Sequence, residues 1–468
     1  MTISKQFLDS ATNRLRKVAV IIDDKEYTYA RLLTLIQQQA NILRLNGFER
    51  GDHLMIKLQG IDFIVMMIAA ADMGLILVPV NPDATQETVQ NIAISTDTPI
   101  IISEGFEAND STFSTSLRFK GRLEDLYLLI TTSGSTGDPK PIVLTQETKL
   151  ARMNALIDLY DINKHDITLI CTPLYHSMAQ RVILASLITG GTLVIQQKWS
   201  AQEFARLVMK YQVTFSVPVA SQIKQIANEI LLIGNSLRRI VSSSALLEPI
   251  TINKMRTLID CPIHNCYGTS EIAIATNRNS ESQIPFYSVG VATQNIDIKI
   301  SDAGEILVNT PLLFDGYYGK RQLTQDSMAY IDNIDGKGKL SARGGAFFKT
   351  GDLGELDANG NLIIRGRIKE LINVGGDKVY PEDIESILLS NSDIEECAAF
   401  ACKDDKFGEI VAVAIVSKHE FTLNEIQTFC IDQLTDAQLP RRLFHAESLA
   451  RTESGKLKRV AIASYYGE

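Results

Sequence analysis

The sequence predicts an α/β fold with a large N-terminal domain of βαβ layers and a smaller α+β domain after it. Over roughly the first 280 residues, apolar strand-like runs alternate with helical runs, which is typical of parallel βαβ units. After about residue 285, short alternating runs joined by Asp/Gly turns indicate antiparallel strands. At 468 residues, the chain is long enough for more than one domain.

Each element of the large domain is predicted from apolar residues at strand or helix spacing. A helix is expected at 29–45, ending near Gly47, and a buried helix followed by a strand is expected over 63–80. The expected strands are, in chain order, 18–22, 53–57, 75–80, 126–130, 167–171, 192–196, 214–218 and 239–242.

The last third of the chain shows a different pattern. Pro381 and the acids after it predict the start of a helix at 380–390. The other expected elements are strands at 297–300, 304–308, 361–364 and 411–416 and a helix at 423–434. We therefore place a domain boundary near 367–370, which gives domains of residues 1–367 and 370–468.

Composition and charge exclude several classes of protein. With 45% apolar and 22% charged residues the chain is an ordinary globular one, and its net charge of −9 argues against a nucleic-acid partner. Six scattered cysteines without a CxxC pair favour a reduced, cytoplasmic setting. The most apolar stretch, 63–80, contains Asp72 and Gly74, so we expect no integral membrane segment.

The run from Thr131 to Lys140 is the strongest functional signal. An apolar strand leads into glycines and hydroxyls that end in a lysine, and such a loop can hold a polyphosphate. It is not a Walker loop, because Pro139 precedes the lysine; a flexible linker is the alternative. The candidate phosphate ligands are Thr132, Ser133, Gly134, Ser135, Thr136, Gly137 and Lys140.

Further segments follow in a fixed order: 265–271 (Asn-Cys-Tyr-Gly-Thr-Ser-Glu), 349–353 (Lys-Thr-Gly-Asp-Leu), 366–372 (Gly-Arg-Ile-Lys-Glu-Leu-Ile) and 454–459 (Ser-Gly-Lys-Leu-Lys-Arg). With the phosphate run, they make the chain resemble the adenylate-forming superfamily of acyl- and aryl-CoA synthetases, peptide-synthetase adenylation domains and firefly luciferase. The resemblance extends from Tyr27 to Arg459. It implies a distorted β-barrel part in the large domain and a mobile C-terminal domain with its hinge at Lys369.

The resemblance implies ATP and Mg²⁺ as cofactors and gives roles to single residues. Glu271 would be catalytic as the Mg²⁺ ligand, because Mg²⁺ prefers hard oxygen ligands. Tyr267 and Asn265 would contact adenine, and Asp352 and Arg367 the ribose or phosphate. Further nucleotide contacts are expected from Ser244, Ala245, Gly268 and Ser270. Outside this pattern, such residues are more often core, surface or turn residues.

Lys456 matches the catalytic lysine of the family. Adenylation requires mainly positioning and charge neutralisation, which a lysine can supply. The mobile domain would then turn and present Gly375 and Gly376 to the arm of CoA or phosphopantetheine. A plain tight turn is the alternative for these glycines.

The segment 172–178, containing Tyr175 and His176, resembles the acid-binding segment of acyl- and aryl-CoA synthetases. Because 175–179 lacks an acid that could pair with an ammonium group, an amino-acid substrate is disfavoured. We expect His176 to be catalytic, bordering the carboxylate and ATP sites. The pocket for an aryl or short- to medium-chain acyl acid is assigned to His176, Met178, Val219 and Ser243.

The acyl acceptor has two candidates. The expected function is an acid–thiol ligase that transfers the acyl group to CoA. Because the chain between Asn81 and the phosphate run is short for the family, an acyl, aryl or peptidyl carrier protein is the alternative acceptor. An inactive nucleotide-binding scaffold is a third hypothesis, which the presence of Glu271, Asp352 and Lys456 disfavours.

Overall fold

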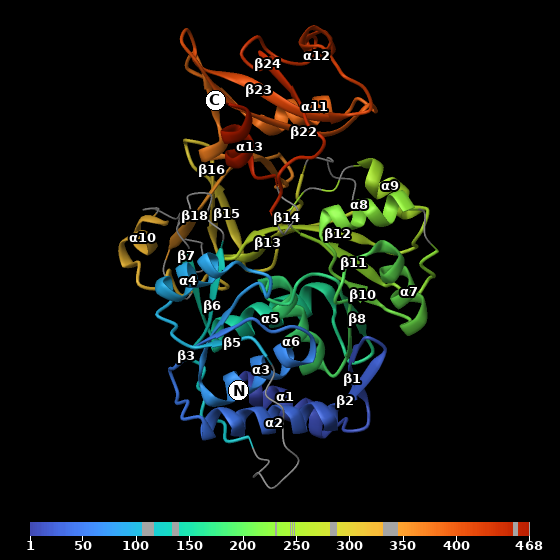
Figure 1. Cartoon of the computed structure of the whole chain (residues 1–468), viewed down its shortest axis with the longest axis vertical. Coiled ribbons are helices and arrows are strands. Elements are labelled where there is room, and N and C mark those ends of the chain that lie inside the picture. Colours follow the sequence, from blue (N-terminus) through green and yellow to red (C-terminus); the bar gives the residue numbers. More distant parts are fainter. Residues whose placement is uncertain are drawn as a thin grey trace. The chain divides into compact units, whose positions relative to one another are not determined.

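The computed structural model describes residues 1–104, 117–132, 140–229, 232–243, 245, 247, 249–280, 288–330, 345–452 and 457–467. The chain forms two compact units (Figure 1). The first comprises residues 1–283, 293–296 and 309–348, and the smaller second unit comprises 284–292, 297–308 and 349–468. The predicted α/β class with a large N-terminal and a small C-terminal part is confirmed.

One sheet of the first unit contains five of the predicted βαβ strands. Its strands within the first unit are, in order, β13 (Ala273–Asn279), β12 (Ile263–Thr269), β11 (Arg239–Ser242), β10 (Phe215–Ser216), β8 (Ile167–Ile170), β9 (Thr192–Ile195), β1 (Val18–Ile22) and β2 (Lys25–Thr28). The strands from β12 to β1 are parallel, whereas β13 and β2 are antiparallel additions at the two sides. The carboxyl ends of β8, β10, β11 and β12 therefore share one edge.

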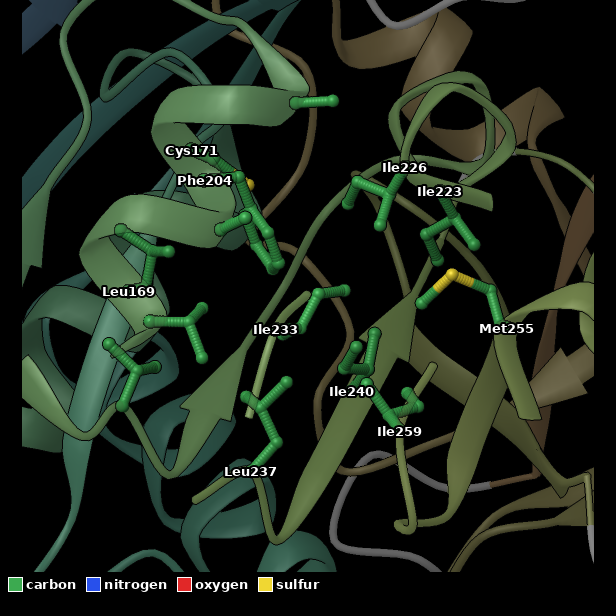
Figure 2. Close-up of a cluster of buried hydrophobic side chains, with 14 of the residues drawn as sticks. Leu169, Cys171, Phe204, Ile223, Ile226, Ile233, Leu237, Ile240, Met255 and Ile259 are labelled. Atoms are coloured by element: carbon green, nitrogen blue, oxygen red, sulfur yellow. The ribbon is translucent and has the colours of Figure 1, made fainter. Parts of the chain in front are cut away.

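An apolar core holds this sheet against three helices, α7 (Ala201–Tyr211), α8 (Ala220–Glu229) and α9 (Pro249–Arg256) (Figure 2). Leu169 and Ile240 come from the strands and meet Phe204, Ile223 and Met255 from the helices. All five side chains are fully buried, and each such burial stabilises the fold by about 1.5–3 kcal/mol. This core fixes the strand ends on which the candidate site is built.

A second sheet has the order β5 (Ile101–Ile102), β3 (His53–Ile56), β4 (Ile76–Pro79), β6 (Leu126–Thr132) and β7 (Lys140–Thr145). Its strands are parallel except for β7, which forms an antiparallel hairpin with β6. The helices of the first unit also include α1 (Ile3–Thr12), α2 (Tyr29–Leu45), α3 (Gly60–Met73), α4 (Gln86–Ser95), α5 (Gln146–Tyr160), α6 (Ser177–Thr189) and α10 (Arg321–Asp326).

The apolar stretch at 63–80 forms α3 and β4, as predicted. Gly74 ends α3 in the left-handed conformation with φ 76°, where glycine has no steric penalty. Asp72 is buried, and its carboxylate accepts hydrogen bonds from Arg44 and from the main-chain N–H groups of Arg118 and Phe119. Among the described residues, no helix combines the length and apolar character needed to cross a membrane.

The second unit contains two small sheets. In the first, β15 (Asp297–Ile300), β16 (Glu305–Asn309), β18 (Ala346–Leu356) and β19 (Leu362–Arg367) are neighbours in that order. The second has the order β21 (Asp377–Val379), β20 (Ile372–Val374), β23 (Gly408–Ser417) and β22 (Ile394–Asp404), with β24 (Arg442–His445) beside β23. Its helical elements are η1 (Ile368–Glu370), α11 (Pro381–Leu388), α12 (Leu423–Cys430) and α13 (Arg459–Tyr466).

The packing groups the antiparallel strands around 297–308 and 349–367 with the C-terminal segment. The sequence predicted the domain boundary near 367–370 from the change of pattern there. This boundary stays a prediction.

Candidate active site

The predicted acid-binding residues lie at the point of the larger sheet where the strand order reverses. From β8 the chain passes through α6 to β9 on one side, whereas from β10 it passes through α8 to β11 on the other side. The two connections diverge at the carboxyl ends of neighbouring strands, which is where open α/β sheets bind ligands. The loops that leave these strands carry His176 and Val219, and Met178 lies in the first turn of α6, which begins at Ser177.

Gln222 joins these two loops. Its side-chain oxygen accepts a hydrogen bond from the N–H of Val219 at 3.0 Å, and its Nε2 donates to the carbonyl of Cys171 at 2.9 Å. His176 is the N-cap residue of α6, and the centroid of its ring lies 4.5 Å from the ring centroid of Tyr175. The four predicted pocket residues are all partly exposed: His176, Met178, Val219 and Ser243.

Asn265 and Tyr267 lie on β12, which follows β11 in the sheet. Both are buried, and Asn265 Nδ2 donates to the carbonyl of Ala245 at 3.0 Å. Asn265 Oδ1 is buried without a hydrogen-bond partner among the described residues. A buried acceptor of this kind is costly unless a ligand donor meets it, and the amino group of adenine is such a donor. Ser244 lies outside the described residues.

The turn between β12 and β13 presents Ser270 and Glu271. Gly268 precedes it at a bulge, where an added Cβ would lie 1.7 Å from the carbonyl oxygen of Ala273. The close strand pairing therefore accounts for this glycine. Glu271 is partly exposed, and a single carboxylate here fits Mg²⁺, which proteins usually hold through one or two carboxylates together with substrate phosphates.

Arg152 on α5 forms hydrogen bonds to the main chain of this turn. Its side chain is 1% exposed and donates to three main-chain carbonyls: Nη1 to Ser270 at 2.8 Å, Nη2 to Glu271 at 2.6 Å and Nε to Leu312 at 2.8 Å. The planar guanidinium is suited to several acceptors at once. The position of Glu271 thus depends on a residue more than 100 positions earlier in the chain.

Tyr317 links Glu271 to the hairpin of the predicted phosphate loop. Its hydroxyl donates to Glu271 Oε1 at 2.9 Å, and burial followed by the charge of Glu271 raises the pKa of this hydroxyl. Tyr317 also pairs with Ile142 of β7, and Tyr318 N–H donates to the carbonyl of Pro141. Thr132 and Lys140 face each other at the end of this hairpin. The candidate ligands Ser133, Gly134, Ser135, Thr136 and Gly137 lie outside the described residues.

The second unit holds the predicted ribose and hinge residues. Asp352 and Arg367 are cross-strand partners on β18 and β19, and Arg367 Nε lies 3.3 Å from Asp352 Oδ1. Lys369 lies in η1, directly after β19. Gly375 and Gly376 form the two-residue turn between β20 and β21, with φ of 59° and 102°. Lys456 lies outside the described residues.

Sequence reasoning missed Arg152, Gln222 and Tyr317. Their signal in the sequence is weak, because single polar residues in helices and loops are common. Arg152 stands out only as a charge inside a helix whose neighbours Leu150 and Met153 are apolar. Their contacts join segments far apart in the chain, and local patterns do not reveal such contacts.

Comparison with known proteins places the chain in a family. Residues 7–318 match the family of AMP-binding enzymes, and residues 383–456 match the C-terminal domain of these enzymes. The chain belongs to the AMP-binding enzyme family. The predicted resemblance to adenylate-forming enzymes is therefore confirmed.

Individual relatives are similar over nearly their whole length. The chain is 26% identical to oxalate–CoA ligase of Arabidopsis thaliana (100% of this chain, 97% of the relative) and 24% identical to long-chain-fatty-acid–CoA ligase FadD13 of Mycobacterium tuberculosis (95% and 94%).

Its fold is similar to that of o-succinylbenzoate CoA synthetase (MenE) of Bacillus subtilis, at 22% identity. The structure of MenE with its acyl-adenylate intermediate matches with a TM-score of 0.86 (98% of this chain, 97% of MenE). The structure with ATP and a magnesium ion matches with 0.84 (97% and 98%).

Proposed function

We propose that this enzyme is an ATP-dependent acid–thiol ligase that forms an acyl-adenylate and then a thioester of CoA. The observation that carries the proposal is the bond from Tyr317 to Glu271, because the segment around Tyr317 also pairs with the hairpin of the phosphate run. A carboxylate suited to Mg²⁺ is thereby linked to the hairpin of β6 and β7, between which the run suited to phosphates lies in the sequence. The names of the relatives, all CoA ligases, support the same reaction class.

In the first half-reaction, a carboxylate oxygen of the acid attacks the α-phosphorus of ATP, and the bond to the leaving pyrophosphate breaks. Bound ATP and Mg²⁺ supply the electrophilic phosphorus and neutralise charge on the leaving group. On this proposal Glu271 holds the metal, Asn265 accepts from the adenine amino group, and His176 borders the acid. Lys456 neutralises charge between the carboxylate and the phosphate.

In the second half-reaction, the thiol sulfur attacks the acyl carbon, the carbon–oxygen bond to AMP breaks, and the thiol proton passes to water. CoA is the proposed acceptor, and phosphopantetheine on a carrier protein is the alternative. The acid is proposed to be apolar, because the segment 175–179 contains no acid that could pair with an ammonium group and because Met178 and Val219 are apolar. The acids in the relatives' names range from oxalate to long-chain fatty acids and do not narrow this choice.

Pyrophosphate exchange tests the proposal. Purified protein with ATP, Mg²⁺ and a panel of benzoates, cinnamates and short- to medium-chain fatty acids should exchange labelled pyrophosphate into ATP with at least one acid. Adding CoA should then yield the thioester. Silence with every acid would support an inactive scaffold instead. A thioester formed only with a holo carrier protein would favour the carrier-loading enzyme.

A further inference from the structure

Two buried basic side chains lie one turn apart on α5. Lys149 is fully buried and Arg152 is 1% exposed. Placing a cation in the interior costs several kcal/mol unless its donors are satisfied, so a structural or functional need is expected at each position. Burial, followed by the charges of Arg181 and Arg152, lowers the pKa of Lys149 well below its usual range.

Both side chains donate to acceptors in the loops of the candidate site. Arg152 bonds to the carbonyls of Ser270 and Glu271, as described above. Lys149 Nζ donates to Gln180 Oε1 at 3.1 Å, and Gln180 Nε2 donates to the carbonyl of Tyr175 at 2.8 Å. Gln180 is buried on α6, which packs beside α5 (Figure 1). One face of α5 therefore contacts the turn that carries Ser270 and Glu271 and, through Gln180, the loop that carries Tyr175 and His176.

The hydrogen bonds of Arg152 and those of Lys149 end beside different functional groups. Arg152 fixes the backbone of Glu271 itself, so its loss would move the carboxylate. Lys149, through Gln180, fixes the carbonyl that precedes His176. Displacing a group of the site by about 1 Å can reduce the rate by about 100-fold, although neither basic side chain need touch a substrate.

We infer that Arg152 and Lys149 are positioning residues for separate parts of the adenylation site. Arg152 orients Glu271 for Mg²⁺ and ATP, and Lys149 orients the Tyr175–His176 loop for the acid. The inference rests on the proposed function. It goes beyond that function by assigning two buried basic side chains of α5 to two different substrates.

The experiment compares Arg152→Met and Lys149→Met in the full-length protein. Calorimetry with an ATP analogue whose α,β bond cannot be cleaved, with and without Mg²⁺, measures how much the metal tightens binding. Arg152→Met should reduce this Mg²⁺-dependent gain by about 10- to 100-fold, the usual effect of removing a group that orients a metal ligand. Lys149→Met should keep the gain and instead raise the KM for the acid in pyrophosphate exchange.

Tyr29→Phe is the matched control. The Tyr29 hydroxyl is buried and donates to the main-chain carbonyls of Leu187 and Gly191, so its loss costs stability but should change neither quantity. If Arg152→Met does not fold, Arg152→Lys gives an intermediate test, since an ammonium can reach only part of the three carbonyls.

Two results would overturn the inference. One is that Mg²⁺ increases the affinity for the ATP analogue as much in the Arg152 variants as in wild type. The other is that Tyr29→Phe loses as much of this Mg²⁺-dependent increase in affinity as Arg152→Met does. The proposed function fails on a different result, which is wild-type protein that shows no exchange with any acid.

Discussion

Gly375 shows how one residue can have both a structural and a functional explanation. It occupies a two-residue turn between antiparallel strands with positive φ at both positions, a turn that strongly favours glycine. The turn alone thus accounts for Gly375 and Gly376. Passage of the phosphopantetheine arm along this backbone remains a prediction from the family resemblance.

Gly375→Asn separates the two explanations. Asparagine tolerates the left-handed conformation, and among the described residues a Cβ at this position would meet only Phe407, at an ordinary 3.5 Å. We expect adenylation to be unchanged and thioester formation to fall by roughly 10- to 100-fold, the order of effect of a misplaced thiol. Separate assays of pyrophosphate exchange and thioester formation measure this.

Gly360→Asn is the control, because Gly360 also has positive φ, and a Cβ there would meet nothing within 4 Å in the part of the chain that the structure describes. If both variants matched wild type in both assays, Gly375 would serve the turn alone.

At the scale of elements, α13 is tied to α11 and η1 by one guanidinium. Arg459 donates to Glu385 at 2.7 Å, Glu382 at 3.0 Å and Glu370 at 3.1 Å. Three carboxylates around one cation leave an excess of negative charge in a buried place. Burial raises the pKa of Glu385 to about 7, although Arg459 acts to lower it.

This raised pKa predicts a pH dependence of stability. Between its ordinary value of 4.5 and about 7, the folded protein keeps a proton on Glu385 that the unfolded chain releases. The contribution of Glu385 to the free energy of unfolding therefore falls as pH rises through this window. Glu385→Gln should remove this contribution.

Thermal unfolding of both proteins at about pH 5 and about pH 7.5 measures the difference. Wild type should lose stability relative to Glu385→Gln on going to the higher pH. Parallel changes in the two melting temperatures would contradict the raised pKa.

The positions of helices and strands were more predictable from the sequence than the pairing between strands. The strands at 18–22 and 239–242 and the helix at 29–45 lie where the apolar spacing predicted them, because that spacing reflects burial on one face. Antiparallel pairing of β12 with β13 was not predicted. It depends on contacts across a bulge at Gly268, and these contacts become visible only after folding.

The same distinction applies to the candidate site. Sequence motifs selected Asn265 and Glu271 as candidate site residues. They did not predict Arg152 and Tyr317, the residues that hold Glu271 in place. Each joins segments separated by tens to more than a hundred residues. Local patterns can thus indicate a chemical group, but its orientation comes from long-range packing.

At the scale of the whole molecule, the predicted functional groups are divided between the two units. Asn265 and Glu271 belong to the first, whereas Asp352, Arg367 and Gly375 belong to the second. Lys456 follows in the C-terminal segment, three residues before Arg459. If the two half-reactions use different groups of the second unit, a single substitution there can stop one half-reaction and spare the other.

Lys456→Ala is the sharpest case. The lysine is proposed to neutralise charge during attack on the α-phosphorus, so its loss should abolish pyrophosphate exchange, with a fall of at least about 100-fold, as for other groups that stabilise developing charge. Transfer to the thiol needs no charge on that phosphate to be neutralised. The variant, supplied with chemically prepared acyl-adenylate and CoA, should therefore form thioester at close to the wild-type rate.

Lys458→Ala, a change of the same kind two residues later, should leave both rates near wild type. Equal loss of both half-reactions in Lys456→Ala would refute the use of different groups in the two steps, because one lysine would then serve both.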